Sequence, residues 1–321
     1  MKEEIRKRIE KENIKGLEIH KLCYDVFFKA VFERKRDVLL DFICIFFNLD
    51  SDNYDYNLSI GYEIPGINMY GKVNKADILV TIDNRLYINI EVNKRSEGSI
   101  LSRNVVQLSR IYGIARKSGK SDKELMNIRC KQLNINTFDT YTGKEVEYLA
   151  ICEKETGRVV SEILEICNVD IEKCYETVYN GPIEKLPKEV RIGAIFKSTS
   201  LKEISYILGE DILSMEKKKS FLRTIKEVNS DDRILQDWML EDNAKMMYEN
   251  QMETACQDAK KEGKEEGREE GREEGREENK LEVIQNMIKE DIECSIISKV
   301  TNKPIHEIEK IKKKMLTKAV S

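Results

Sequence analysis

Histidine, closely spaced cysteine and glycine-rich nucleotide motifs are scarce in this sequence of 321 residues. Only His20 and His306 are present, near opposite ends of the chain, and neither has a nucleophile motif beside it. The eight cysteines form no C-x-x-C pair, which argues against a structural zinc site. No G-x-x-x-x-G-K-[ST] motif occurs, and no G-x-G-x-x-G motif follows a strand pattern. Carboxylates, and with them a metal ion, are therefore the catalytic groups that we expect.

Long apolar runs are missing as well. The longest, Phe42 to Phe47, is far too short to span a bilayer. The first fifteen residues are densely charged and contain no apolar region of the kind found in signal peptides. We therefore expect a cytoplasmic protein with no membrane association, in which the cysteines are free thiols.

The charge of the chain is nearly balanced but unevenly distributed. There are 55 basic and 59 acidic residues, a net charge of −4, which argues against bulk attraction to nucleic acid. Residues 93–131, however, contain ten basic and three acidic residues, a local net charge of +7. This segment is either a solvated basic helix or a surface that faces phosphates.

Alternating strand and helix patterns over residues 1–255 predict an α/β domain. Leu22 to Leu49 has helical spacing, whereas residues 76–92 follow the period of two that is typical of a β-hairpin. A basic helix is expected from Leu101 to Arg116, and the runs CKQLNINTF and EYLAICEKE resemble further strands. Beyond Ser161 the pattern predicts helices and irregular segments.

Residues 256–280 form a charged segment in which Gly263, Gly267, Gly271 and Gly275 recur with a strict period of four. A helix here would align like charges at i,i+4, and each glycine would cost about 0.8–1 kcal/mol relative to alanine. Two interpretations stay open. The glycine stripe is either the seam of a homodimer or part of a solvated helical spacer.

Residues 281–321 regain helical periodicity. Thr301 to Lys303 has turn character, and Pro304 suits the first position of a final helix. Two short helices joined in this way resemble a helix-turn-helix. Glu307 and Glu309, however, occupy the part of the last helix that would meet bases, which favours a packing or oligomerisation unit over a DNA-reading one.

The predicted hairpin brings two carboxylates together. If the loop is Asp83 to Arg85, Ile82 pairs with Leu86, and the same register places Asp77 directly opposite Glu91. Their Cβ atoms would then lie about 4.5–5.5 Å apart, and two like charges at that distance repel unless a cation lies between them. Mg²⁺ or Mn²⁺ suits such oxygen ligands. An exposed charged strand face is the alternative, and a two-residue loop would break the register.

The order of these motifs resembles a known family. Asp25 in YDVFFKAVF, Asp77 in ADILV and Glu91 in NIEVNK resemble the PD-(D/E)xK nuclease superfamily, and more narrowly the bacterial recombination-promoting nuclease/putative transposase (Rpn) family. The likeness extends to the helix with Arg103, Gln107 and Tyr112, to LNINTF and to the repeats of the tail. It implies a restriction-endonuclease-like mixed sheet flanked by helices, with Mg²⁺-dependent cleavage of DNA and an association with recombination.

The resemblance also implies roles for individual residues. Asp77 and Glu91 would be metal ligands, and Asp25 either an accessory carboxylate or an i,i+4 ion-pair partner of Lys29. Asn93 stands where the superfamily has lysine and would position the attacking water. The residues expected to contact DNA are Arg103, Gln107, Arg110, Arg116 and Lys117. Because Asn93 carries no charge, a degenerate nuclease-fold protein that binds DNA or self-associates is the alternative function.

Overall fold

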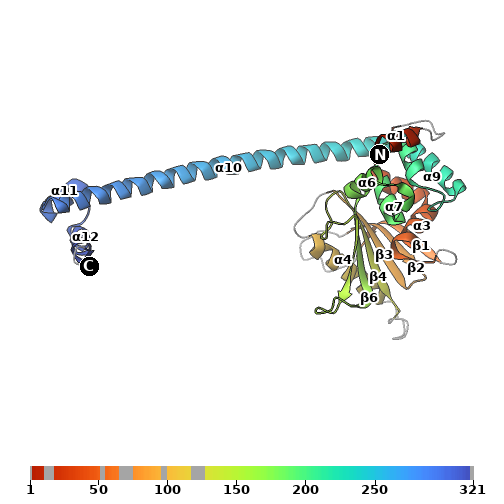
Figure 1. Cartoon of the computed structure of the whole chain (residues 1–321), viewed down its shortest axis with the longest axis horizontal. Helices are drawn as coiled ribbons and strands as arrows, with labels where there is room; N and C mark the ends of the chain where they lie inside the picture. The colour runs from red at the N-terminus through yellow and green to blue at the C-terminus, as the bar shows by residue number, and fades with distance from the viewer. Residues whose placement is uncertain are drawn as a thin grey trace. The chain divides into compact units, whose positions relative to one another are not determined.

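The fold was analysed in a computed structural model, which describes residues 2–10, 18–50, 55–64, 75–94, 100–116 and 127–318 (Figure 1). The chain divides into two compact units, residues 1–241 and residues 242–321. Lys117, one of the expected DNA-contacting residues, lies outside the described residues.

The first unit combines helices with six strands. Its helices are α1 (Lys2–Glu10), α2 (Asp25–Arg34), α3 (Arg36–Phe47), α4 (Ile100–Arg116), α6 (Ile171–Asn180), the 3-10 turn η1 (Ile183–Lys185), α7 (Lys188–Ile195), α8 (Leu201–Ile207), α9 (Met215–Val228) and the start of α10 (Asp232–Lys289). Its strands are β1 (Tyr56–Glu63), β2 (Lys75–Ile82), β3 (Leu86–Asn93), β4 (Arg129–Asn136), β5 (Val146–Cys152) and β6 (Val159–Asp170). The predicted α/β class is therefore confirmed.

The strands form one mixed sheet in the order β1-β2-β3-β4-β6-β5. β1, β2 and β3 are antiparallel neighbours, β4 is parallel to both β3 and β6, and β5 is antiparallel to β6. The parallel step from β3 to β4 requires a crossover, and α4 lies within it. β3, β4 and β6 are thus the interior strands on which the candidate site is built.

The two faces of this sheet differ in chemistry. On one face, isoleucine, leucine and valine side chains join a continuous apolar core with α2, α3, α7 and α9. The helix α4 packs against β3 and β4, and its Leu108 and Ile111 belong to a smaller second core. Figure 1 shows α4 on one side of the sheet and α3 and α7 on the other. Beside the second core, buried amide side chains line the sheet.

Two expectations about the elements were wrong, and one strand was not predicted. The helical pattern from Leu22 to Leu49 forms two helices, because Lys35, with φ −126° and ψ 57°, interrupts it. Residues 159–170 form strand β6, although the sequence predicted helices and irregular segments beyond Ser161. Its apolar residues recur partly at helical spacing, yet pairing with both β4 and β5 fixes the extended form. β1 was not expected at all.

The second unit is helical and has its own small core. It contains most of α10, then α11 (Cys294–Thr301) and α12 (Ile305–Lys318), with Asn302 in the left-handed conformation between them (φ 53°). The predicted break between two short helices is thus confirmed, but Thr301 is the last residue of α11, and Pro304 directly precedes α12 instead of being its first residue. Ile284, Ile288, Ile297 and Ile308 form the core.

The glycine repeat of α10 is helical throughout. A Cβ atom built at any of its four glycines would meet no other atom within 4 Å, so nothing in the described chain covers the stripe. Among the described helices, none combines the length and apolar composition that a bilayer-spanning segment needs.

Candidate functional site

The β2–β3 hairpin has the predicted loop. Ile82 pairs with Leu86 and Ile78 with Ile90, and the connection between the strands is Asp83 to Arg85. Asp83 and Asn84 adopt φ values of 50° and 52°, a conformation that aspartate and asparagine tolerate better than most residues. Continued by one residue, the same register makes Asp77 and Glu91 the next pair. The predicted proximity of Asp77 and Glu91 required this three-residue loop, and the structure has it.

The Asp77 carboxylate is held at both oxygens. Its Oδ2 accepts the backbone N–H of Val92 at 3.0 Å. Its Oδ1 lies 3.0 Å from the Lys29 ammonium of α2, which also lies 2.8 Å from Asp25 Oδ2. The expected i,i+4 ion pair between Asp25 and Lys29 is thus confirmed, and Lys29 additionally joins α2 to β2.

Glu91 lies deeper, with only 7% of its surface exposed. Its Oε1 accepts a hydrogen bond from Asn89 Nδ2 at 3.1 Å, and the backbone N–H of Asp77 also donates to the carboxylate. Burial and the neighbouring charge of Asp77 raise the pKa of Glu91 to about 8, although Asn89, Arg103 and the Asp77 N–H act in the opposite direction. The negative charge of Glu91 is therefore poorly compensated within the chain.

The pKa of Asp77 is raised as well, mainly by burial and then by the charge of Asp25, while the Val92 N–H and Lys29 oppose the shift. For Lys29, burial alone would lower the pKa, but the hydrogen bond and charge of Asp25 and the charge of Asp77 raise it overall. The ammonium is consequently kept protonated between the two aspartates.

A row of buried amides crosses the sheet beside Glu91. Its members lie on β3, β4 and β6, and we call Asn89, Asn93, Gln132, Asn134, Asn136 and Asn168 the amide row. All six are at most 5% exposed. Because side chains alternate along a strand, they share the face on which Glu91 lies and on which α4 packs.

Hydrogen bonds run through the amide row in one direction. Asn93 Nδ2 donates to Asn136 Oδ1 at 3.0 Å and, at 3.5 Å, to Asn134 Oδ1. Asn134 Nδ2 donates to Asn168 Oδ1 at 2.8 Å. Asn168 Nδ2 donates to Glu147 Oε1 on β5 at 2.9 Å. The row therefore ends on a carboxylate.

At its other end the row meets a cation. Arg103 of α4 donates from Nη2 to Asn93 Oδ1. Asn93 is thus engaged at both its oxygen and its nitrogen, and the structure places it as a link between Arg103 and β4. Lys94, the next residue, forms an ion pair with Glu241 and lies over the ring of Tyr24.

The residues expected to contact DNA lie in different environments. Gln107 is 4% exposed and belongs to the buried side of α4. Arg110 is half-buried, and Arg116 is exposed. The Arg116 guanidinium donates to the Tyr112 hydroxyl at 3.0 Å and lies over its ring. Of these arginines, Arg116 is the one placed openly toward solvent.

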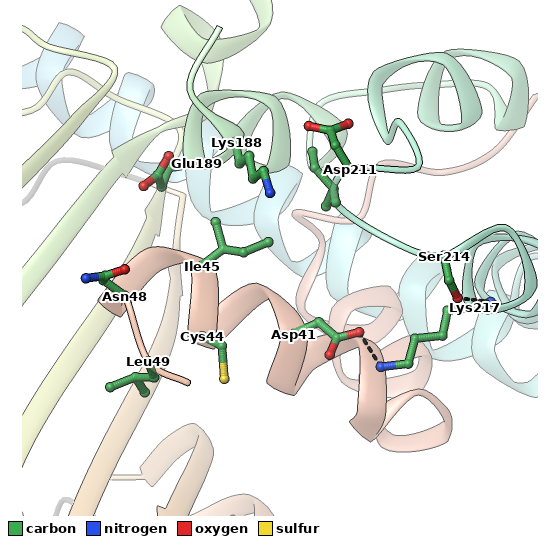
Figure 2. A pocket seen from close by; sticks show the side chains of 11 residues that line it. Asp41, Cys44, Ile45, Asn48, Leu49, Lys188, Glu189, Asp211, Ser214 and Lys217 are labelled. Carbon is green, nitrogen blue, oxygen red and sulfur yellow. Dashed lines mark hydrogen bonds and ion pairs between the residues drawn. The ribbon is translucent and has the colours of Figure 1, made fainter. Parts of the chain in front are cut away.

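A separate pocket of about 490 Å³ lies between α3, α7 and α9 (Figure 2). Its charged lining is largely paired within the protein. Lys217 lies 2.6 Å from Asp41, as the dashed line in Figure 2 marks, and Asp211 accepts two hydrogen bonds from Arg191. None of the expected site residues lines this pocket, so it is distinct from the candidate site.

The candidate site fits a divalent cation held by few protein ligands. Among the described residues, no group of three or more His, Cys, Asp or Glu side chains is arranged to hold a metal ion. Mg²⁺, however, is commonly bound through one or two carboxylates, with water and substrate phosphates completing its coordination. Asp77 and Glu91 supply two. Asn89 Oδ1, fully buried and without a hydrogen-bond partner in the described chain, shows that the polar surroundings of Glu91 are incomplete.

Sequence reasoning missed the contact of Lys29 with Asp77 and the amide row. The row had a recognisable pattern, since Gln132, Asn134 and Asn136 alternate with Leu133 and Ile135 in β4. A strand with neighbours on both sides is usually apolar on both faces.

Comparison of the chain with protein-family models, with curated proteins and with solved structures gives no match.

Proposed function

We propose that the chain is a metal-dependent DNA endonuclease that hydrolyses phosphodiester bonds, with a restriction-endonuclease-like fold similar to that of the Rpn family. The observation that supports this most directly is the pair of carboxylates on adjacent strands, the half-buried Asp77 and the buried Glu91, whose charge is poorly compensated. The mixed sheet flanked by helices agrees with the fold that the resemblance implies. By the same resemblance, the activity would be linked to recombination or transposition.

In this proposal Asp77 and Glu91 hold Mg²⁺ or Mn²⁺, and Asp25 is an accessory carboxylate that orients Lys29. The ion would supply Lewis-acid stabilisation of the charge that develops on phosphate and activation of water. Arg103, fixed through Asn93 and the amide row, would place a guanidinium beside Glu91. Arg116, together with Arg110 and Lys117, would contact the DNA backbone, which makes binding sensitive to salt.

The test is nicking of supercoiled plasmid by the full chain with Mg²⁺ or Mn²⁺. We expect wild-type protein to nick, and Asp77→Asn and Glu91→Gln to abolish nicking, since each nearly isosteric change removes one ligand charge. Glu155→Gln, at an exposed position, is the matched control and should nick as the wild type does. Absence of nicking by pure wild-type protein, or undiminished nicking by Asp77→Asn, would contradict the proposal.

A non-catalytic, DNA-binding function is favoured by one observation. Position 93 carries no charge, and both ends of its amide are already engaged by Arg103 and Asn136. A protein of this kind would retain labelled duplex DNA in an anisotropy assay without cleaving it. Arg116→Ala would weaken retention, and the wild-type affinity would fall as the salt concentration rises.

A further inference from the structure

One lysine already holds part of the proposed cation site. Lys29 Nζ lies 2.8 Å from Asp25 Oδ2 and 3.0 Å from Asp77 Oδ1. Its side chain and that of Asp77 are 27% and 20% exposed, so both charges are partly shielded from water. The second oxygen of Asp77 accepts the Val92 N–H. Asp77 Oδ1, the oxygen without a backbone donor, is therefore the one that the ammonium contacts.

The position of the ammonium is set by the helix that carries it. Asp25 and Lys29 are four residues apart on α2, which places their side chains on the same side of the helix. Phe27, Phe28 and Phe32 of the same helix are fully buried and anchor it in the core. Lys29 is thus directed to Asp77 by a rigid element, and Asp25 acts as its second point of attachment.

We propose that Lys29 is the resident counter-ion of this site and competes with the divalent cation for Asp77 Oδ1. The inference rests on the proposed function, because it presumes that Asp77 is a metal ligand. When the divalent ion binds, the ammonium gives up Asp77 but stays attached to Asp25. The ammonium then remains in the site, where it can contact a phosphate. It would supply a positive charge that Asn93, which stands at the position of the motif lysine, does not have.

The competing account is that Lys29 only fastens α2 to β2. In that case its removal would lower stability and leave the intrinsic affinity for metal unchanged or reduced. Competition predicts the opposite for affinity, because removal of a positive charge about 3 Å from a ligand oxygen favours another cation there.

The experiment is titration calorimetry of the full chain with Mn²⁺, with folding checked by circular dichroism. We expect Lys29→Met to bind Mn²⁺ about tenfold more tightly than wild type or better, and Lys29→Arg, which keeps the charge, to bind as wild type does. Lys29→Gln serves as the uncharged variant if Lys29→Met does not fold. Lys217→Met is the matched control, since Lys217 forms a comparable ion pair with Asp41 in the pocket of Figure 2.

The outcomes separate the two proposals. Equal or weaker Mn²⁺ binding by folded Lys29→Met, with wild-type binding that depends on Asp77 and Glu91, overturns the role of Lys29 alone. Wild-type binding that survives both Asp77→Asn and Glu91→Gln, or no binding by any variant, overturns the metal site on which the proposed function depends. A gain in affinity that Lys217→Met shares would be an effect of overall charge and would also overturn the role of Lys29.

Discussion

Glu91 and Glu147 are two buried glutamates on the same face of one sheet, yet their surroundings act on them in opposite ways. Glu147, 4% exposed, accepts the backbone N–H groups of Tyr141 and Thr142 at 3.0 and 2.9 Å, as well as Asn168 Nδ2. Burial would raise the pKa of Glu147, but these hydrogen bonds outweigh it and lower the pKa. Glu91 instead faces Asp77, and its pKa is raised.

The difference shows that burial alone does not mark a functional carboxylate. Glu147 has enough donors to remain ionised and acts as an anchor for the amide row and for the loop at residues 141–142. Glu91 has fewer donors and a like charge beside it, and the charge of Arg103 does not offset these effects, so its pKa stays raised. This contrast separates a structural glutamate from a candidate ligand.

The largest expected effect is the loss of the Glu147 charge. Glu147→Gln keeps the shape but leaves two backbone N–H groups with a weaker acceptor, so we expect a loss of about 3 kcal/mol in the free energy of unfolding at pH 7. Urea denaturation measures it. Glu155→Gln, at the exposed turn after β5, is the control and should change stability by less than about 0.5 kcal/mol.

The corresponding substitution at Glu91 should raise the free energy of unfolding, whereas that at Glu147 lowers it. The folded-state pKa of about 8 lies above the ordinary value of 4.5, so stability contributed by Glu91 is fully present below pH 4.5 and is lost as pH rises through 8. Without divalent cations, Glu91→Gln should therefore stabilise the protein by about 2 kcal/mol at pH 9, and its stability should vary less between pH 5 and 9. If Glu91→Gln instead destabilised the protein at pH 9, the two glutamates would not differ in this way, and the prediction would be wrong.

Divalent cations should sharpen the comparison further. At a concentration ten times the dissociation constant, Mn²⁺ should stabilise the wild type by about 1.4 kcal/mol, seen as a rise in the thermal midpoint. Glu147→Gln should show a similar rise from its lower starting point. Glu91→Gln should show none, because it lacks a ligand charge, and an equal rise in all three proteins would point to binding elsewhere.

The smallest expected effect is the loss, at acidic pH, of the stability that the Glu147 charge contributes. Because the pKa of Glu147 is lowered from 4.5, its contribution to stability is present above pH 4.5 and is lost as pH falls through the folded-state pKa. The stability difference between wild type and Glu147→Gln should consequently narrow between pH 4.5 and 3.5, by at most about 1 kcal/mol. Paired urea titrations at the two pH values measure this, and a widening gap would mean that Glu147 is not the ionised anchor.

Local patterns were enough to predict part of the site. The turn residues Asp83 and Asn84 and the alternation on either side of them fixed the hairpin register, and this register determines the proximity of Asp77 and Glu91. Lys29 could be assigned to Asp25 by helical spacing, but its contact with Asp77 joins residues 48 positions apart and depends on how α2 packs on β2. Likewise, Asn93 could be located on its strand, whereas its bond to Arg103 depends on the placement of α4.

The amide row also limits its own possible conformations. Every carboxamide has one accepting end and one donating end, so turning one over requires its neighbour to turn as well. Reversing the path from Asn93 through Asn134 to Asn168 would require all three amides to turn, together with Gln132, which also donates to Asn134 Oδ1. Arg103 can only donate to Asn93, and the ionised Glu147 can only accept from Asn168, so both ends select the same arrangement. The two end charges, on α4 and β5, therefore fix the direction of the hydrogen bonds that cross the sheet between them.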